Sequence, residues 1–134
     1  MTTHILFICI GNACRSQMAE GWLKSLCAAA AKADIETHSA GSAPLGHIPE
    51  ETVAVMKEVD IDITEQWSKS IAELPRQDFD YVISLCGDRC PYVPAEQHID
   101  WAIPDPIGQS IEKYRESRDL LKTHIERFLA EILK

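Results

Sequence analysis

The sequence has little of what a secreted, membrane-spanning or nucleic-acid-binding protein needs. Its longest N-terminal apolar run, Ile5 to Ile10, is too short to span a bilayer or to form the apolar part of a signal peptide, and no basic residues flank it. Positive charge is scarce, because 13 Lys and Arg face 21 Asp and Glu for a formal net charge of −8. Without a basic field, we expect neither a nucleic acid nor a membrane as a partner, and we expect a cytoplasmic protein.

Proline and glycine are also few, with 7 and 6 residues, while 46% of the 134 residues are apolar. This composition is typical of a folded chain, and the length predicts one domain over residues 1–134, with a monomer as the default state. The cysteines are five: Cys9, Cys14, Cys27, Cys86 and Cys90. An odd count without an export signal argues against a fixed disulfide framework and for thiols in a reducing compartment, so reactive cysteines have to be considered.

Apolar runs and helical patterns alternate along the chain. Strands are predicted at residues 4–9, 36–42, 80–86 and 98–103, and helices from about residue 16, from residue 49, and over residues 111–133. Such alternation predicts a parallel sheet covered on both faces, which binds ligands at the carboxyl ends of its strands. Cys9, Cys86 and Asp105 each follow a predicted strand, so we expect them at one edge of the sheet.

The first loop, Cys9-Ile10-Gly11-Asn12-Ala13-Cys14-Arg15-Ser16, joins a buried strand to a helix. Its backbone N–H groups, gathered at a helix N-terminus, predict a cradle for a tetrahedral oxyanion, and Arg15 adds a guanidinium suited to two of the oxygens. Such positive surroundings favour a thiolate nucleophile at Cys9, to which Ser16 can donate a hydrogen bond. The alternative is a structural cysteine with Arg15 in solvent.

The other candidates leave alternatives open from the residues alone. Asp105, between two prolines, fits a general acid and equally a turn residue. Cys86 and Cys90 fit a reactive thiol pair or two incidental thiols. Together with His98 they could also supply three ligands of a metal, but the spacing is not a familiar zinc pattern, so we expect no metal. Cys27 is expected to pack in a helix, and the five histidines share no spacing that indicates catalysis.

The segments "GNACRSQMAEGW", "HSAGS", "MKEVDIDIT", "SLCGD" and "PDP" together resemble the low-molecular-weight protein tyrosine phosphatases, and still more the arsenate reductases that share their fold. The resemblance covers nearly the whole chain. It implies an α/β three-layer sandwich with a four-stranded parallel sheet. It also implies that Cys9 attacks a bound phosphate or arsenate and that Asp105 is the general acid. The residues it assigns to the oxyanion are Ile10, Gly11, Asn12, Ala13, Cys14, Arg15 and Ser16.

The thiol pair separates the two families. A phosphatase needs only water to release phosphate, whereas a reductase must supply two electrons to arsenate. In the arsenate reductases that the chain resembles, a second cysteine attacks the nucleophilic one and a third resolves the disulfide. Carried over, Cys86 attacks Cys9 and Cys90 attacks Cys86, and thioredoxin, or alternatively glutaredoxin with glutathione, reduces the final disulfide without a bound cofactor. The alternatives are a tyrosine phosphatase, which the lack of an aromatic residue after Asp105 disfavours, and a non-catalytic oxyanion-binding or redox-sensing module.

The sequence departs from the resembling families at two places. Only three residues separate Cys86 from Cys90, fewer than in the thioredoxin-linked members, which leaves both reductants open. Some relatives bind potassium with residues matching Asn12, Glu20 and Ser39 plus an acid, where this chain has Lys69. We predict that Lys69 replaces the cation, paired with Glu20, and that the protein does not respond to potassium; the alternative is a solvated surface lysine.

Overall fold

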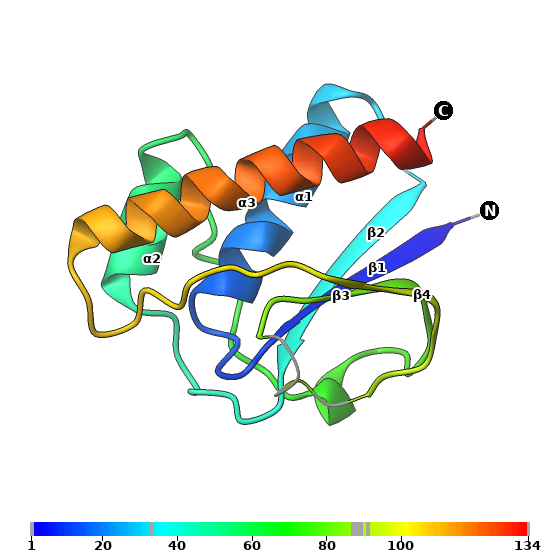
Figure 1. Cartoon of the computed structure of the whole chain (residues 1–134), viewed down its shortest axis with the longest axis horizontal. Helices are drawn as coiled ribbons and strands as arrows, with labels where there is room; N and C mark the ends of the chain where they lie inside the picture. The colour runs from blue at the N-terminus through cyan, green and yellow to red at the C-terminus, as the bar shows by residue number, and fades with distance from the viewer. Residues whose placement is uncertain (1, 33, 87–89, 91, 134) are drawn as a thin grey trace.

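The computed structural model describes residues 2–32, 34–86, 90 and 92–133. Its centre is a four-stranded sheet of β1 (Thr3–Cys9), β2 (Ile35–Gly41), β3 (Phe79–Ser84) and β4 (Ala95–Asp100), all parallel and in the order β2-β1-β3-β4 (Figure 1). The chain leaves β1 for β2 on one side and reaches β3 on the other. Cys9, the last residue of β1, therefore lies where the strand order reverses, which is the position at which open α/β sheets bind ligands.

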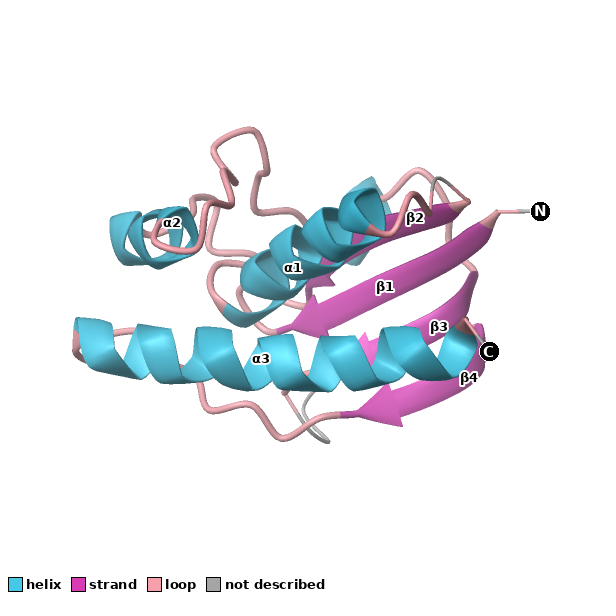
Figure 2. Cartoon of the chain, turned by 90° about the horizontal axis from the view of Figure 1, so that it is seen from above, coloured by secondary structure: helices cyan, strands magenta, loops and turns pink. Residues whose placement is uncertain are grey.

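Helices α1 (Arg15–Ala29) and α3 (Ile111–Ile132) lie over one face of the sheet, and α2 (Glu50–Lys57) packs against them beyond the ends of the strands, as Figure 2 shows. Under them lies the larger apolar core, with Ile5, Phe7 and Ile83 pointing up from the strands. The opposite face is covered by the short 3-10 helix η1 (Ile71–Glu73) and its neighbouring segments, over a second core that includes Leu6. The α/β class with a parallel sheet between two covering layers is confirmed.

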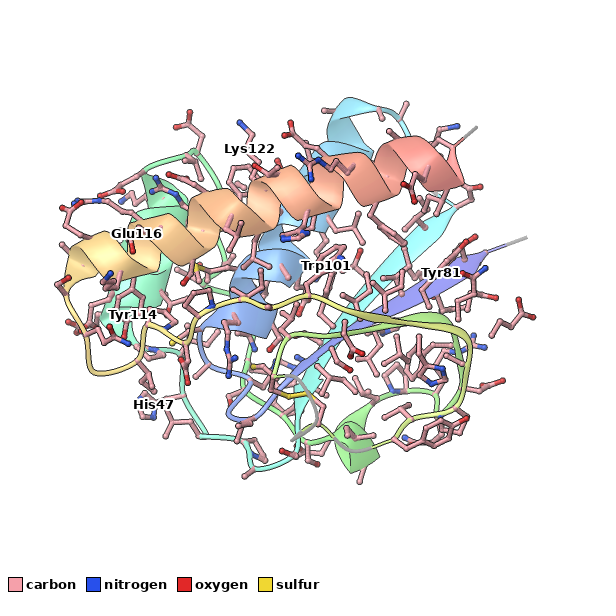
Figure 3. All side chains as sticks on the ribbon, viewed as in Figure 1. His47, Tyr81, Trp101, Tyr114, Glu116 and Lys122 are labelled. Atoms are coloured by element: carbon pink, nitrogen blue, oxygen red, sulfur yellow. A yellow bond between two sulfur atoms is a disulfide. The ribbon has the colours of Figure 1, made fainter. Side chains whose placement is uncertain are left out.

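The core under α3 is aromatic. Tyr81 of β3 and Trp101, just past β4, both meet the ring of Phe128 edge to face, with centroids 5.1 and 6.1 Å apart (Figure 3). Trp22 of α1 is buried and its indole N–H donates to the carbonyl of Arg118 at 3.0 Å. These contacts fix α1 and α3 over the sheet. Among the described residues, no helix has the length and apolar character that crossing a bilayer requires.

Several predicted boundaries were wrong in ways that matter for the site. β3 ends at Ser84, two residues before Cys86, and β4 covers 95–100 rather than 98–103. β4 is the edge strand of the sheet, so its residues are half-buried or exposed and show no clear apolar pattern. The prediction was based instead on the apolar residues that follow the strand, and it was therefore placed too far along the chain. Asp105 consequently lies in a loop five residues beyond β4. The single turn of η1 was not predicted.

Candidate active site

The loop between β1 and α1 is held by its carbonyl groups. The carbonyls of Cys9, Ile10 and Gly11 accept hydrogen bonds from the backbone of residues 42–45, at 3.3, 2.9 and 2.9 Å. Within the described part of the chain, no backbone N–H of residues 11–14 donates to a backbone carbonyl. Because peptide N–H and carbonyl groups point in opposite directions, the loop presents donors on the side away from residues 42–45. This arrangement can bind an oxyanion at the N-terminus of α1.

Asn12 shapes this loop from the inside. It is fully buried with φ of +45°, a conformation that asparagine tolerates better than most residues. Its amide donates to Ser16 Oγ at 2.7 Å and Ser39 Oγ at 3.1 Å, and its Oδ1 accepts from the backbone N–H of Lys69 and the amide of Gln17, both at 2.9 Å. One buried side chain therefore ties the loop to α1, to β2 and to the segment that holds Lys69.

Gly41, the last residue of β2, allows the loop to approach closely. A Cβ at this position would lie 2.4 Å from the carbonyl oxygen of Ile10 and 2.8 Å from the backbone nitrogen of Asn12. Both are main-chain atoms of the loop, so no side-chain movement can relieve the clash. The glycine sets the distance between β2 and the oxyanion cradle.

Cys9 lies at the base of the cradle. It is 2% exposed, and its Sγ lies 2.9 Å from Ser16 Oγ. Since Asn12 already donates a hydrogen to Ser16 Oγ, the serine can direct its own hydroxyl hydrogen at the sulfur. A hydrogen bond from Ser16 would hold the Cys9 side chain in place at the base of the cradle. The structure places Ser16 within hydrogen-bonding distance of Cys9, and its role as donor stays a prediction.

Arg15, the first residue of α1, is aimed at the same place. Its guanidinium donates through NH1 to the carbonyls of Leu85 and Ile103, at 2.8 and 3.2 Å, and its NH2 lies 3.5 Å from Asp105 Oδ2. The residue is 4% exposed, so the alternative of a solvated arginine is wrong. The Asp105 side chain is 41% exposed, and its loop is held to α3 by the hydroxyl of Ser117, which donates to Pro104 O at 2.8 Å. A carboxyl that is open to solvent and beside the oxyanion cradle can deliver a proton there.

The second pair of cysteines forms a disulfide. Cys86 and Cys90 are bonded, with Cα atoms 5.7 Å apart, and Cys90 Sγ lies 3.7 Å from the carbonyl oxygen of Ile8, the residue before Cys9. The backbone N–H of Leu85 donates to the same carbonyl at 2.8 Å. The pair is therefore packed against the end of β1. Residues 87–89, which separate the two cysteines, lie outside the described residues. The three-residue spacer does permit the bond, and the alternative of two incidental thiols is disfavoured.

The two remaining cysteines are buried and unpaired thiols. Burial raises the pKa of Cys14 to about 11, and Cys27 packs into the main core with 5% of its surface exposed. A raised pKa keeps a thiol protonated and unreactive at neutral pH. Cys14 thus contributes its backbone to the loop while its side chain is inert, and Cys27 is structural as expected.

Lys69 lies behind the loop, not in solvent. It is 9% exposed, and its Nζ lies 3.9 Å from Glu20 Oε1, 3.5 Å from Ser39 Oγ and 2.9 Å from the carbonyl of Trp67. Burial lowers the pKa of Lys69, and the charge of Glu20 opposes that shift. The predicted pairing with Glu20 is confirmed. With an ammonium among these oxygens, the residues do not fit a potassium ion.

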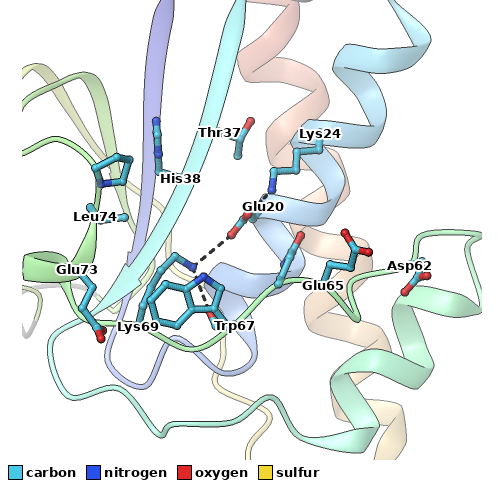
Figure 4. Close-up of a pocket in the computed structure, with 12 residues that line it drawn as sticks. Glu20, Lys24, Thr37, His38, Asp62, Glu65, Trp67, Lys69, Glu73 and Leu74 are labelled. Atoms are coloured by element: carbon cyan, nitrogen blue, oxygen red, sulfur yellow. Dashed lines mark hydrogen bonds and ion pairs between the residues drawn. The ribbon is translucent and has the colours of Figure 1, made fainter.

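Glu20, Trp67 and Lys69 also line an open pocket, drawn in Figure 4, which carries charges of both signs. Its volume is about 450 Å³. The pocket borders α1 and β2 on the side of the loop away from the nucleophile, since Cys9, Arg15 and Asp105 do not line it. It is not the oxyanion site.

Sequence reasoning missed the residues that hold the site together. The roles of Gly41, Gln17 and the carbonyls of Leu85 and Ile103 depend on chain segments that meet only in three dimensions. The role of Asn12 was detectable in part, because asparagine after glycine in a strand-to-helix turn is a known sign of a left-handed residue.

The fold and this site are those of a known class. A family model described as "Low molecular weight phosphotyrosine protein phosphatase" matches residues 4–134, and the chain belongs to that family. Within it, "Glutaredoxin arsenate reductase" of Synechocystis sp. is 38% identical over 132 residues, or 96% of this chain and 97% of the relative. "Arsenate reductase 1" of Staphylococcus saprophyticus is 39% identical over 130 residues, or 92% and 94%. A solved structure described as "An arsenate reductase in the phosphate binding state" matches with a TM-score of 0.85 at 38% identity, over 98% of this chain and 99% of that one.

Proposed function

We propose that this protein reduces arsenate to arsenite through a relay of three thiols. The observation that carries the proposal is the Cys86–Cys90 disulfide, packed against the end of the strand that bears Cys9. A phosphatase needs no second thiol pair, whereas a reductase needs a source of two electrons next to the oxyanion. Relatives named as arsenate reductases that cover more than nine tenths of the chain support the same conclusion.

The first step joins the substrate to the protein. Arsenate lies in the cradle of residues 10–16 with two oxygens on Arg15, and the Cys9 thiolate attacks arsenic in line with a leaving oxygen. A sulfur–arsenic bond forms and an arsenic–oxygen bond breaks. Asp105 gives its proton to the leaving oxygen, which departs as water. The exposure of Asp105 lets solvent restore the proton afterwards.

The second and third steps move the electrons. The thiolate of Cys86 attacks the sulfur of Cys9, and the electron pair of the broken sulfur–arsenic bond stays on arsenic, which leaves as arsenite. Cys90 then attacks Cys86, and the Cys9 thiolate departs. The two electrons have come from the Cys86 and Cys90 thiols. The end product on the protein is the disulfide that the structure contains.

An external dithiol must reduce that disulfide for the next turnover. Thioredoxin is the first candidate, because one dithiol protein completes the exchange, and glutaredoxin with glutathione is the second, in keeping with the name of the Synechocystis relative. The two are separated by following arsenate-dependent NADPH oxidation with each purified reducing system in turn.

The test compares four proteins in both systems: wild type, Cys86→Ser, Cys90→Ser and, as a matched control, Cys27→Ser in α1. Multiple turnovers by wild type and Cys27→Ser, with loss in the other two variants, are expected. Turnover that survives in Cys86→Ser would overturn the relay.

The same variants separate the rival functions. Cys9, Arg15 and Asp105 suffice for hydrolysis of a phosphate ester, so a phosphatase would hydrolyse para-nitrophenyl phosphate equally well with and without Cys86 while forming no arsenite. A non-catalytic oxyanion-binding or redox-sensing module would bind phosphate and form the disulfide but release no product. Steady-state arsenite release is expected only of the reductase.

A further inference from the structure

Three side chains that can ligate a metal converge at the other end of the sheet from Cys9. His4 Nδ1, near the start of β1, lies 3.0 Å from Glu36 Oε2 and 3.3 Å from His38 Nε2, both from β2. One ligand atom from each residue lies within 4.8 Å of the other two. Neither the oxyanion site nor the thiol relay uses any of them.

The register of β1 and β2 brings these three residues together, although His4 is far from the other two in the sequence. His4 pairs with Glu36, and His38 lies two residues further along β2, on the same face of the sheet. Side chains on one face of neighbouring strands touch directly or diagonally, so residues 34 apart in the chain become neighbours. The ring of Phe79 packs edge-on against His38, with centroids 5.4 Å apart, and restrains its orientation.

The spacing of the ligand atoms suits a small divalent ion. Zinc binds His nitrogen and carboxylate oxygen at about 2.0–2.2 Å in a tetrahedron, which separates its ligand atoms by about 3.3–3.5 Å. Two of the three separations, 3.0 and 3.3 Å, are already close to this value. The Glu36 side chain is 57% exposed, so it is free to adjust the third.

We propose that His4, Glu36 and His38 form a binding site for a divalent transition metal ion of the zinc class, with water as the fourth ligand. Two imidazoles and a carboxylate are a ligand set typical of zinc, whereas calcium and magnesium prefer oxygen ligands alone. The ion takes the place of the hydrogen between the two facing ring nitrogens, and the ring that carried this hydrogen changes tautomer, so that each neutral imidazole keeps one proton on the nitrogen that faces away from the ion.

An acidic residue lies beside the cluster, and there is room for a water ligand. Asp80 lies beside the cluster, since its carboxylate accepts the backbone N–H of His4 at 2.7 Å, and the whole chain is acidic. His38 lines the pocket of about 450 Å³ described above (Figure 4). Glu36 and His38 both line a second pocket of about 330 Å³ at the edge of β2. A water ligand can reach the ion from either side.

The site is separate from the oxyanion loop. His4 precedes Cys9 by five residues of one strand, or about 16 Å at about 3.3 Å per residue. A metal here joins the edge strand β2 to the central strand β1. The ion therefore cross-links the two strands, stabilises the sheet and takes no part in the reaction. This inference does not depend on whether the protein reduces arsenate.

The test is ¹⁵N NMR of the histidine rings in the oxidised full-length protein, with zinc chloride added to one equivalent. Ring nitrogens report the ligands directly, so zinc bound to a thiol is not mistaken for this site. The expected result is a shift of His4 Nδ1 and His38 Nε2 to metal-bound positions, while the rings of His47, His98 and His124 stay unchanged. Unmoved rings of His4 and His38, with zinc bound elsewhere or not at all, would overturn the proposal.

Variants give a second measurement by calorimetry. His38→Gln and Glu36→Gln should each weaken zinc binding at least about tenfold, because each removes one of three protein ligands. His47→Gln is the matched control, since His47 is exposed in the loop between β2 and α2 (Figure 3). Equal zinc affinity in all the variants would contradict the assignment. The ring spectra need no variant, so a folding defect in one of them does not remove the test.

Discussion

Replacing Gly41 with alanine tests how closely the oxyanion loop is packed. The added Cβ would lie 2.4 Å from the carbonyl oxygen of Ile10 and 2.8 Å from the nitrogen of Asn12, where ordinary contacts are 3.4 Å or more. The loop and the end of β2 must therefore separate by about 1 Å. Both contacts are with main-chain atoms, so the backbone of the cradle itself has to move.

The size of the effect follows from that displacement. Overpacking a well-packed interior costs about 1–3 kcal/mol, and we expect the upper half of this range because no flexible side chain can yield. A shift of about 1 Å also lengthens the hydrogen bonds from the loop to a bound anion beyond their effective range. We expect phosphate, a stable analogue of arsenate, to bind at least about tenfold more weakly.

Urea unfolding and phosphate calorimetry measure the two effects. Gly11→Ala is the matched control, because a Cβ at this position, inside the loop, meets only the Cβ atoms of Ala13 and Leu45, at 3.8 and 3.9 Å. It should leave the free energy of unfolding within about 0.5 kcal/mol of wild type. If Gly41→Ala unfolds and binds phosphate like wild type, or if the two variants have the same free energy of unfolding, the reasoning is refuted.

Three further predictions follow from charged and buried groups. Hydrogen bonds from Arg115 and Arg118 lower the pKa of Glu58 to about 2, so the stability that the Glu58 carboxylate contributes is present above pH 4.5 and is lost as the pH falls towards 2. The melting temperature of Glu58→Gln should therefore be below that of wild type at pH 6 and equal to it near pH 2. A difference in melting temperature that does not change with pH would count against this. Since the pKa of Cys14 is about 11, iodoacetamide should alkylate it at pH 8.5 much more slowly in the folded than in the unfolded protein, as mass spectrometry can measure. Exchanging sodium for potassium should leave wild-type turnover unchanged within about twofold and should stimulate Lys69→Asp, in which a carboxylate replaces the ammonium; a marked stimulation of wild type would refute the role of Lys69.

The fold was largely predictable because strong local patterns agree with the final structure. β1 is buried on both faces, so its apolar run was unambiguous, and the last helix was predicted within about one residue at each end. β4 was misplaced because edge strands bury little and their polar residues give no clear pattern. Its position is set by pairing with β3, a long-range contact that no local pattern contains.

The site was predictable where its residues are close in sequence. Cys9, Arg15 and Ser16 belong to one loop, and the structure brings them together as expected, with Asp105 joining them from a loop rather than from a strand end. The support behind them was not predictable. Gly41 acts through backbone contacts and His4 meets His38 through strand register, and neither relation leaves a trace in local spacing.

The most direct test of the relay is a single turnover without any external reductant. Fully reduced protein is mixed with arsenate, the arsenite formed per chain is counted, and the disulfides are mapped by mass spectrometry. The account predicts close to one arsenite per chain together with a Cys86–Cys90 disulfide in wild type, and one arsenite with a trapped Cys9–Cys86 disulfide in Cys90→Ser. No arsenite from reduced wild type, or the same yield from Cys86→Ser, would contradict it.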